Sequence, residues 1–173
     1  MNEIESVIAQ IVEKFGADPS EFAGEKSLLI AHEKLTALAS YLANEAGFEF
    51  LSAVTAVDYW PQESPRFHLL YRFTSISRIL SLNIRVPING VKPTADSLEK
   101  IYYNANWQER EVYDMFGITF EGNSDLRRIL MPHDWQGHPL RKDYPLGYEE
   151  PQFTFNFNEI DLRKPHGQNR AGN

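Results

Sequence analysis

The sequence predicts an α+β fold: a two-layer domain with helices on one face of a mainly antiparallel or mixed sheet, followed by an extended tail. Three observations support this class. Residues 4–15 and 35–46 carry apolar side chains at helical spacing. Residues 66–86 contain stretches in which apolar and polar side chains alternate, as in a half-buried sheet. After residue 117 no periodicity is sustained, and glycine and proline become frequent.

The N-terminal part of the domain is expected to contain two helices and two strands. Residues 4–15 and 35–46 form the helices, and a glycine, a common helix stop, follows each of them. A short apolar run at 27–31 predicts a buried strand between them. Residues 48–58 are rich in β-forming side chains and predict the next strand.

A β-hairpin is predicted in the middle of the chain. In residues 66–73 the odd-numbered side chains are apolar, and in residues 79–86 the even-numbered ones are. Each strand therefore has one dry face and one wetter face. Only residues 74–78 separate them, a gap short enough for an antiparallel pair.

A capping-box pattern occurs twice after the hairpin. Residues 96–99 (Asp-Ser-Leu-Glu) follow Pro93 and predict the start of a helix. Residues 106–109 (Asn-Trp-Gln-Glu) repeat the pattern, and Gly117 supplies a stop, so we expect a helix over 107–116. The expected order of elements is α-β-α-β-β-β-α.

The domain is expected to end near residue 120. We assign residues 1–120 to a globular α+β domain and 121–173 to an extended loop and tail. Residues 117–151 contain four glycines and four prolines, which makes this segment long for a loop. Its aromatic side chains argue against a disordered linker, so we expect it to fold against another surface.

Composition limits the chemistry that this chain can perform. The chain has 173 residues, 42% of them hydrophobic, and no cysteine, which excludes disulfides, thiolate nucleophiles and cysteine-held iron–sulfur clusters. The net charge is −7, with 9 acids and 3 bases in the first fifty residues, so a nucleic-acid footprint is not expected. No run approaches the roughly 20 apolar residues of a membrane span, and the acidic N-terminus does not resemble a signal peptide.

One loop contains side chains that could bind a hard metal ion or act as acids and bases: His133, Asp134, His138 and Asp143. Its histidines are five residues apart, with Gly137 between them and Pro139 after them, a spacing that matches no standard zinc motif. On the preceding helix, Arg110 and Asp114 are four apart, as in an ordinary surface ion pair. A small metal-dependent hydrolase is therefore the weaker interpretation.

A partner-binding interpretation explains more of the C-terminal third. Three phenylalanines alternate with polar residues in the tail, as in a strand: Phe153, Phe155 and Phe157. Such a stripe is covered either by a partner, often through strand addition, or by the chain's own sheet. The 126–146 loop adds charged donors and aromatic anchors of the kind found at interfaces: Arg127, Arg128, Arg141, Lys142, Trp135 and Tyr144.

The wording of two stretches closely resembles a known family. Residues 107–120 (WQEREVYDMFGITF) and 126–146 (LRRILMPHDWQGHPLRKDYPL) resemble the C subunit, or 30 kDa subunit family, of NADH–quinone oxidoreductase, respiratory complex I. The resemblance is dense over 107–147, looser through the tail and architectural over the first hundred residues. Asn123 departs from the family motif, which usually carries His or Lys at this place.

The resemblance implies a hydrophilic structural subunit of the quinone module in the peripheral arm, without a cofactor of its own. The complex uses FMN and iron–sulfur clusters to pass electrons from NADH to quinone and links this to proton translocation. The implied partners are subunits D, B and I, and the implied place is the cytoplasmic side of the cell membrane, without a direct span or nucleic-acid contact.

The resemblance also implies that the isolated chain is non-catalytic and that its site residues form a partner interface. The expected interface residues are Glu109, Arg110, Glu111, Asp114, Arg127, Arg128, Trp135, Arg141, Lys142, Asp143, Tyr144, Phe153, Phe155 and Phe157. An equivalent subunit of a ferredoxin- or hydrogenase-linked relative of the complex is the nearest alternative.

Overall fold

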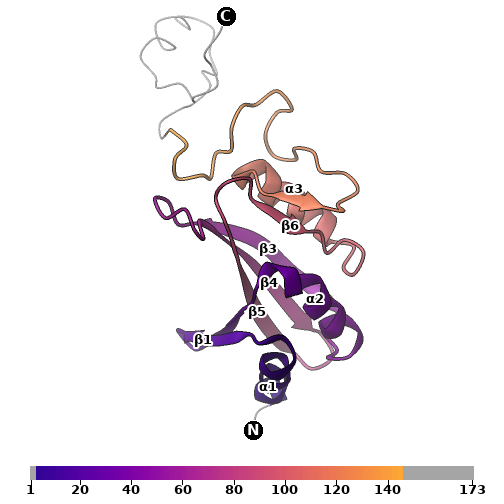
Figure 1. The fold of residues 1–173 in the computed structure, drawn as a ribbon. Helices are drawn as coiled ribbons and strands as arrows, with labels where there is room; N and C mark the ends of the chain where they lie inside the picture. The colour runs from indigo at the N-terminus through magenta and orange to yellow at the C-terminus, as the bar shows by residue number, and fades with distance from the viewer. Residues whose placement is uncertain (1–2, 146–173) are drawn as a thin grey trace, which may run out of the picture.

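A computed structural model describes residues 3–145 of the chain (Figure 1). The elements in chain order are α1 (Glu3–Phe15), β1 (Asp18–Phe22), β2 (Glu25–Leu29), the short 3₁₀ helix η1 (His32–Lys34), α2 (Leu35–Asn44), β3 (Phe50–Asp58), β4 (Phe67–Ser75), β5 (Leu80–Ile88), β6 (Thr94–Asp96), α3 (Ala105–Phe116) and β7 (Thr119–Glu121). The predicted α+β class, with its mainly antiparallel mixed sheet, is confirmed.

The main sheet has five strands in the order β1-β2-β5-β4-β3. The predicted hairpin is present, with β4 antiparallel to β5 and Leu69 opposite Val86. β2 joins the other side of β5 in parallel, which makes the sheet mixed. β1 was not predicted, because its five residues are all exposed and carry no hydrophobic alternation.

The helix expected to start at residues 96–99 is wrong. Thr94–Asp96 form β6, which pairs in parallel with β7, and turns follow instead of a helix. Ser97 Oγ accepts a hydrogen bond from the Glu99 amide (3.1 Å), so the apparent cap closes a turn. The second capping pattern belongs to a real helix, but α3 starts at Ala105, and Asn104 donates to the Leu51 carbonyl instead of capping it.

One hydrophobic core joins the sheet to the helices. The apolar side chains of β4 and β5 predicted to share a face are buried, except Leu80 at the start of β5, which is only partly buried. Phe73 and Leu82 have no exposed surface. Leu38 of α2 and Ile11 of α1 belong to the same core and are also fully buried. Burying one such side chain contributes about 1.5–3 kcal/mol, so this core dominates the stability of the domain.

Candidate functional site

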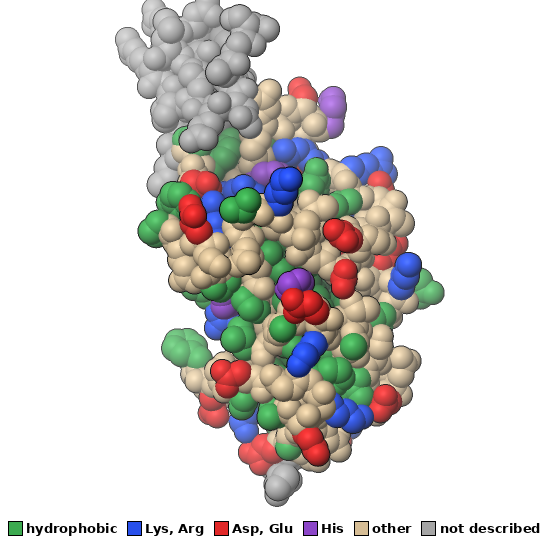
Figure 2. Space-filling view, viewed as in Figure 1, with side chains coloured by type: hydrophobic (Ala, Val, Ile, Leu, Met, Phe, Trp, Pro, Cys, Tyr) green, Lys and Arg blue, Asp and Glu red, His purple; other side chains and the backbone are tan. Residues whose placement is uncertain are grey.

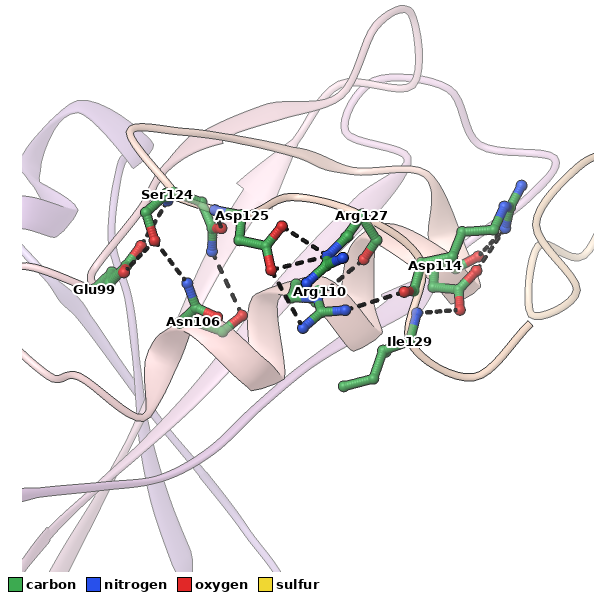
Figure 3. Close-up of polar contacts among 10 residues, drawn as sticks. Glu99, Asn106, Arg110, Asp114, Ser124, Asp125, Arg127 and Ile129 are labelled. Carbon is green, nitrogen blue, oxygen red and sulfur yellow. Dashed lines mark hydrogen bonds and ion pairs between the residues drawn. The ribbon is translucent and has the colours of Figure 1, made fainter. Parts of the chain in front are cut away.

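Residues 122–145, the clamped segment, pass over α3 without forming a helix or strand of their own (Figure 1). The start of this segment is tied to the turn before α3. The Ser124 hydroxyl donates to Glu99 (2.6 Å), and the Ser124 amide donates to the other oxygen of that carboxylate (2.7 Å) (Figure 3). The Asn106 side chain of α3 donates to the Ser124 hydroxyl (3.2 Å).

Asp114 is the centre of the clamp. It has no exposed surface, and its Oδ2 accepts three consecutive backbone amides, from Ile129 (3.0 Å), Leu130 (2.8 Å) and Met131 (2.8 Å). Its Oδ1 accepts a hydrogen bond from the Arg128 guanidinium (2.5 Å). Burial opposes ionisation of this carboxyl, but these hydrogen bonds outweigh burial and lower its pKa. Asp114 is therefore an ionised carboxylate with hydrogen bonds on both oxygens, and it orders residues 128–131 of the segment.

Arg110 fixes the same segment through its backbone carbonyls. Its Nε donates to the Arg127 carbonyl and its Nη2 to the Arg128 carbonyl, both at 3.1 Å (Figure 3). A longer ion pair joins it to Asp125 (3.7 Å). The expectation of a surface ion pair between Arg110 and Asp114 is wrong: both side chains are buried, and each binds the clamped segment instead.

Glu109 forms a second buried carboxylate site on α3. It accepts hydrogen bonds from the Ser97 hydroxyl (2.6 Å), the Leu98 amide (2.7 Å) and the Asn123 side-chain amide (2.8 Å). None of these donors is charged. Burial raises the pKa of Glu109, and the three hydrogen bonds offset only part of that effect. Asn123 therefore acts here as a neutral donor to Glu109.

The C-terminal end of α3 is capped by the far end of the clamped segment. Arg141 Nε donates to the Phe116 carbonyl (2.5 Å), and the Leu140 amide donates to the Met115 carbonyl (3.0 Å). His138 Nδ1 lies 3.0 Å from the Asp114 carbonyl oxygen, which can only accept, so the ring donates from Nδ1. Burial lowers the pKa of His138, as do the nearby arginines. These donors satisfy helix carbonyls that otherwise lack partners.

Two glycines allow this close packing. Gly117 ends α3 in a left-handed conformation (φ +70°), and a Cβ there would meet the His138 ring at 2.5 Å. Gly137 (φ +84°) would place a Cβ 2.8 Å from the Tyr144 ring. Any other residue at either position would have to displace the clamped segment.

A buried arginine, Arg66, holds the C-terminal part of the clamped segment against the sheet. The Arg66 guanidinium binds both oxygens of Asp58, at the end of β3 (2.9 and 2.8 Å). It also binds both oxygens of Asp143 (3.1 and 2.6 Å). The Lys142 amide donates to Asp58 (2.9 Å). Hydrogen bonds from Arg66 lower the pKa of Asp143. In Asp58 burial is the largest effect and opposes ionisation, but Arg66 and the Lys142 and Trp60 amides together outweigh it and lower the pKa.

The four residues of the metal hypothesis do not come together. His133 and Asp134 are exposed, whereas His138 is turned to the α3 backbone and Asp143 to Arg66. Within residues 3–145, no group of three or more histidines and acids is arranged to hold a metal ion. Among the same residues, no helix is long and apolar enough to cross a membrane.

The predicted interface residues fall into three groups. Glu109, Arg110 and Asp114 are buried with partners inside the chain, so they can act on a partner only by shaping the clamped segment. The exposed or partly exposed residues are Glu111, Arg127, Arg128, Trp135, Arg141, Lys142, Asp143 and Tyr144. Phe153, Phe155 and Phe157 lie outside the described residues. Figure 2 shows basic and acidic side chains close together in the upper part of the view, where α3 and the clamped segment lie in Figure 1.

Sequence reasoning missed Arg66, Asp58 and Ser97 as parts of this site. The sequence pattern puts Arg66 on the polar side of one expected strand and Asp58 at the end of another, and it does not connect the two. Arg66 binds Asp58, which is 8 positions away in the sequence, and Asp143, which is 77 positions away. No local pattern encodes a contact of that range; an arginine and an aspartate at adjoining strand ends were the only signal.

The chain matches one protein family over most of its length. The family described as "Respiratory-chain NADH dehydrogenase, 30 Kd subunit" matches residues 28–150. The C subunit of the NADH-quinone oxidoreductase of Herpetosiphon aurantiacus is 43% identical over 145 residues, which cover 83% of this chain and 84% of that protein. The corresponding protein of Geobacter sulfurreducens is 40% identical over 149 residues, covering 84% and 92% respectively.

Solved structures share the fold. The trypsin-resistant fragment (1–134) of Nqo5 superposes with a TM-score of 0.63 and 30% identity, over 72% of this chain and 99% of the fragment. A chain of the membrane-bound sulfane sulfur reductase (MBS), an archaeal respiratory membrane complex, superposes with a TM-score of 0.74 over 99% of each chain, at 21% identity. The family match and the curated relatives together show that this chain belongs to the family of the 30 Kd subunit of respiratory-chain NADH dehydrogenase.

Proposed function

We propose that this chain is a structural subunit of the peripheral arm of NADH–quinone oxidoreductase and that the clamped segment presents part of its partner-binding surface. The observation that carries this proposal is the buried network around Asp114, which fixes a segment without regular secondary structure on α3. Order obtained before binding lowers the entropy cost of association. Such a segment is suited to docking a partner.

The surface that this network leaves exposed has the composition of an interface. Leu130 and Leu140 of the clamped segment are 61% and 54% exposed, and Trp107 of α3 is 62% exposed. The exposed side chains of Arg127 and Lys142 lie on the same segment and supply charge. Aromatic and apolar anchors among charged residues are typical of protein–protein contacts.

In the proposed complex, other chains carry the FMN, the iron–sulfur clusters and the quinone. This chain would hold no cofactor and perform no catalysis by itself, and its partners would be subunits D, B and I. Its place would be peripheral, on the cytoplasmic side of the membrane. The absence of cysteine supports the division of labour, since cluster ligation in this chain would need thiolates.

We further propose that the independently folding unit extends to about residue 145, beyond the boundary expected at residue 120. Its supports are the contacts of the clamped segment with α3 and β3. The likeness to a fragment described as trypsin-resistant, which covers 72% of this chain, agrees with a folded unit that lacks the C-terminal tail.

Deletion of residues 146–173 tests the role of the tail. We expect the shortened chain to keep the circular dichroism spectrum and cooperative unfolding of the intact domain but to be absent from the assembled complex. The measurement is affinity purification from gently solubilised membranes of the source organism, followed by mass spectrometry of co-purifying subunits. Normal stoichiometry of the shortened chain in the complex would show that the tail is dispensable.

The equivalent role in a ferredoxin- or hydrogenase-linked complex is the second candidate. The fold shared with a chain of the sulfane sulfur reductase shows that this architecture also occurs in another respiratory membrane complex. The same purification separates the two candidates. A flavin-bearing NADH subunit among the recovered proteins supports the NADH-linked complex, whereas a hydrogenase or ferredoxin-accepting subunit in its place supports the alternative.

A further inference from the structure

A second surface feature lies on the side of the domain that is far from the clamped segment, where α1 and β1 are found (Figure 1). A groove of about 580 Å³ runs between α1 and the β1–β2 hairpin. Its apolar lining includes Ile8, Ala9 and Val12 of α1 and Pro19 of β1. Clefts of this volume accept several side chains.

The groove exists because α1 has a wider apolar face than the core covers. Val7 and Ile11 are buried in the core, whereas Ile4, Ile8 and Val12, on the adjoining stripe, are only partly buried. A helix whose apolar stripe exceeds its intramolecular contact has surface left for another chain.

One wall of the groove is also a sheet edge. β1 ends the five-stranded sheet, and all five of its residues, from Asp18 to Phe22, are exposed. Within residues 3–145, no strand pairs with the outer side of β1. Such an edge can take an extended segment of another chain through backbone hydrogen bonds.

The charge of the rim indicates what kind of segment fits. Three carboxylates line the groove, those of Glu5, Glu13 and Glu21, and Lys26 is the single basic residue among its lining residues. Lys26 is already paired with Glu5 (3.0 Å). Glu13 and Glu21 therefore add negative potential beside an apolar floor, which favours apolar side chains flanked by cations.

We propose that this groove binds a segment of a partner subunit that carries apolar side chains flanked by lysine or arginine, lying alongside β1. The inference rests on the proposed function, since the partner is another subunit of the same complex. The groove and the clamped segment are different surfaces, because α1, β1 and β2 form the groove, whereas the clamped segment lies on α3.

Photo-crosslinking in the assembled complex tests the groove. Ala9 is exposed and lines it, so a benzoylphenylalanine at this position should form an adduct with another subunit through a peptide rich in apolar and basic residues. The same residue at Lys14, which is on α1, pairs with Glu45 and does not line the groove, should give at least fivefold less adduct. An adduct only with a second copy of this chain, or with its own residues 146–173, would overturn the proposal.

A charge reversal gives an independent readout. The pair Glu13→Lys and Glu21→Lys should lower the crosslinking yield at Ala9 about tenfold, because two favourable rim charges become repulsive. The control Glu33→Lys reverses an exposed carboxylate outside the groove and should leave the yield unchanged. If the chain co-purifies with respiratory subunits but Ala9 yields no subunit adduct, the groove proposal fails and the proposed function stands. If no respiratory subunits are recovered at all, both fail.

Discussion

The sheet core and the clamped segment are stabilised in different ways within one chain. Phe73 and Leu82 have no exposed surface and belong to a core that is almost entirely apolar. In the clamped segment, residues 122–145, order comes from Asp114, Arg110 and Arg66, whose charged groups bind backbone and carboxylates. Apolar burial needs only the correct pattern, whereas a buried charge needs each partner in place. The clamped segment should therefore be able to lose its order while the sheet stays folded, but not the reverse.

The largest expected effect comes from the core. Phe73→Ala removes a fully buried ring from β4 and should lower the free energy of unfolding by about 3–5 kcal/mol. Because the clamped segment rests on this domain, we expect both regions to lose order together. Chemical denaturation followed by circular dichroism measures the loss. Survival of ordered amides at 129–131 in an otherwise unfolded variant would show that the clamp does not depend on the core.

The next effect separates the regions. Asp114→Ala leaves the amides of Ile129, Leu130 and Met131 without their acceptor and Arg128 without its carboxylate, at a cost of about 2–4 kcal/mol. We expect these amides to exchange with deuterium much faster while those of β4 and β5 keep their protection. Equal loss of protection in the sheet would mean that the two regions form one cooperative unit.

Acid should open the clamp before it unfolds the sheet. The pKa values of Asp58, Asp114 and Asp143 are lowered in the folded chain. Their stabilising effect is therefore complete above the unfolded pKa of about 3.9 and is lost as pH falls through the lower folded values. Hydrogen exchange below about pH 4 should show amides 129–131 losing protection first, and simultaneous loss in β4 would contradict an independent opening of the clamp.

Glu109 should respond to pH in the opposite sense. Burial raises its pKa, so its proton is bound more tightly in the folded chain than in the unfolded one. Its contribution is greatest below the unfolded pKa and declines as pH rises through the folded value. The unsubstituted chain should thus gain stability relative to Glu109→Gln as pH falls from 7 to 5, which denaturation midpoints at both pH values would measure. A constant difference would contradict the raised pKa.

The smallest effect is expected at an exposed ion pair outside both regions. Lys14 and Glu45 form a bridge of 3.2 Å with both side chains largely exposed. Because solvent screens such pairs, Glu45→Ala should change the free energy of unfolding by ~0.5 kcal/mol or less. Thermal unfolding of the variant beside the unsubstituted chain measures this. A loss similar to that of Asp114→Ala would show that exposure does not distinguish the two kinds of ion pair.

Sequence patterns predicted the core far better than the site, for a physical reason. The alternation in residues 66–73 and 79–86 follows from the two-residue repeat of a strand, so it is visible in any window of the chain. The roles of Arg110 and Asp114 depend on contacts with backbone atoms of residues 127–131. A short stretch of sequence around either side chain does not show these contacts. Helical spacing alone suggested a surface pair, and only tertiary packing reveals that both side chains turn inward.

Two further errors of prediction, at β1 and at the turn after β6, have different physical causes. β1 has no buried side chain, so its sequence shows no alternation of apolar and polar residues from which a strand could be predicted. Residues 96–99 have the sequence of a capping box, but the Ser97 hydroxyl and the Leu98 amide donate hydrogen bonds to the Glu109 carboxylate. A local preference was overridden by a buried carboxylate that needed donors.

The most direct test of the clamped segment as a partner-binding surface compares two carboxylate variants in the assembled complex. Asp114→Ala removes the centre of the clamp, and Glu33→Ala removes an exposed carboxylate elsewhere as the matched control. Each tagged chain is purified from gently solubilised membranes, and the other subunits are quantified by mass spectrometry. We predict that the Glu33→Ala chain recovers its partners normally and that the Asp114→Ala chain, with its sheet still folded, recovers few or none. Equal recovery by both chains would contradict the proposal that the ordered segment holds the partners.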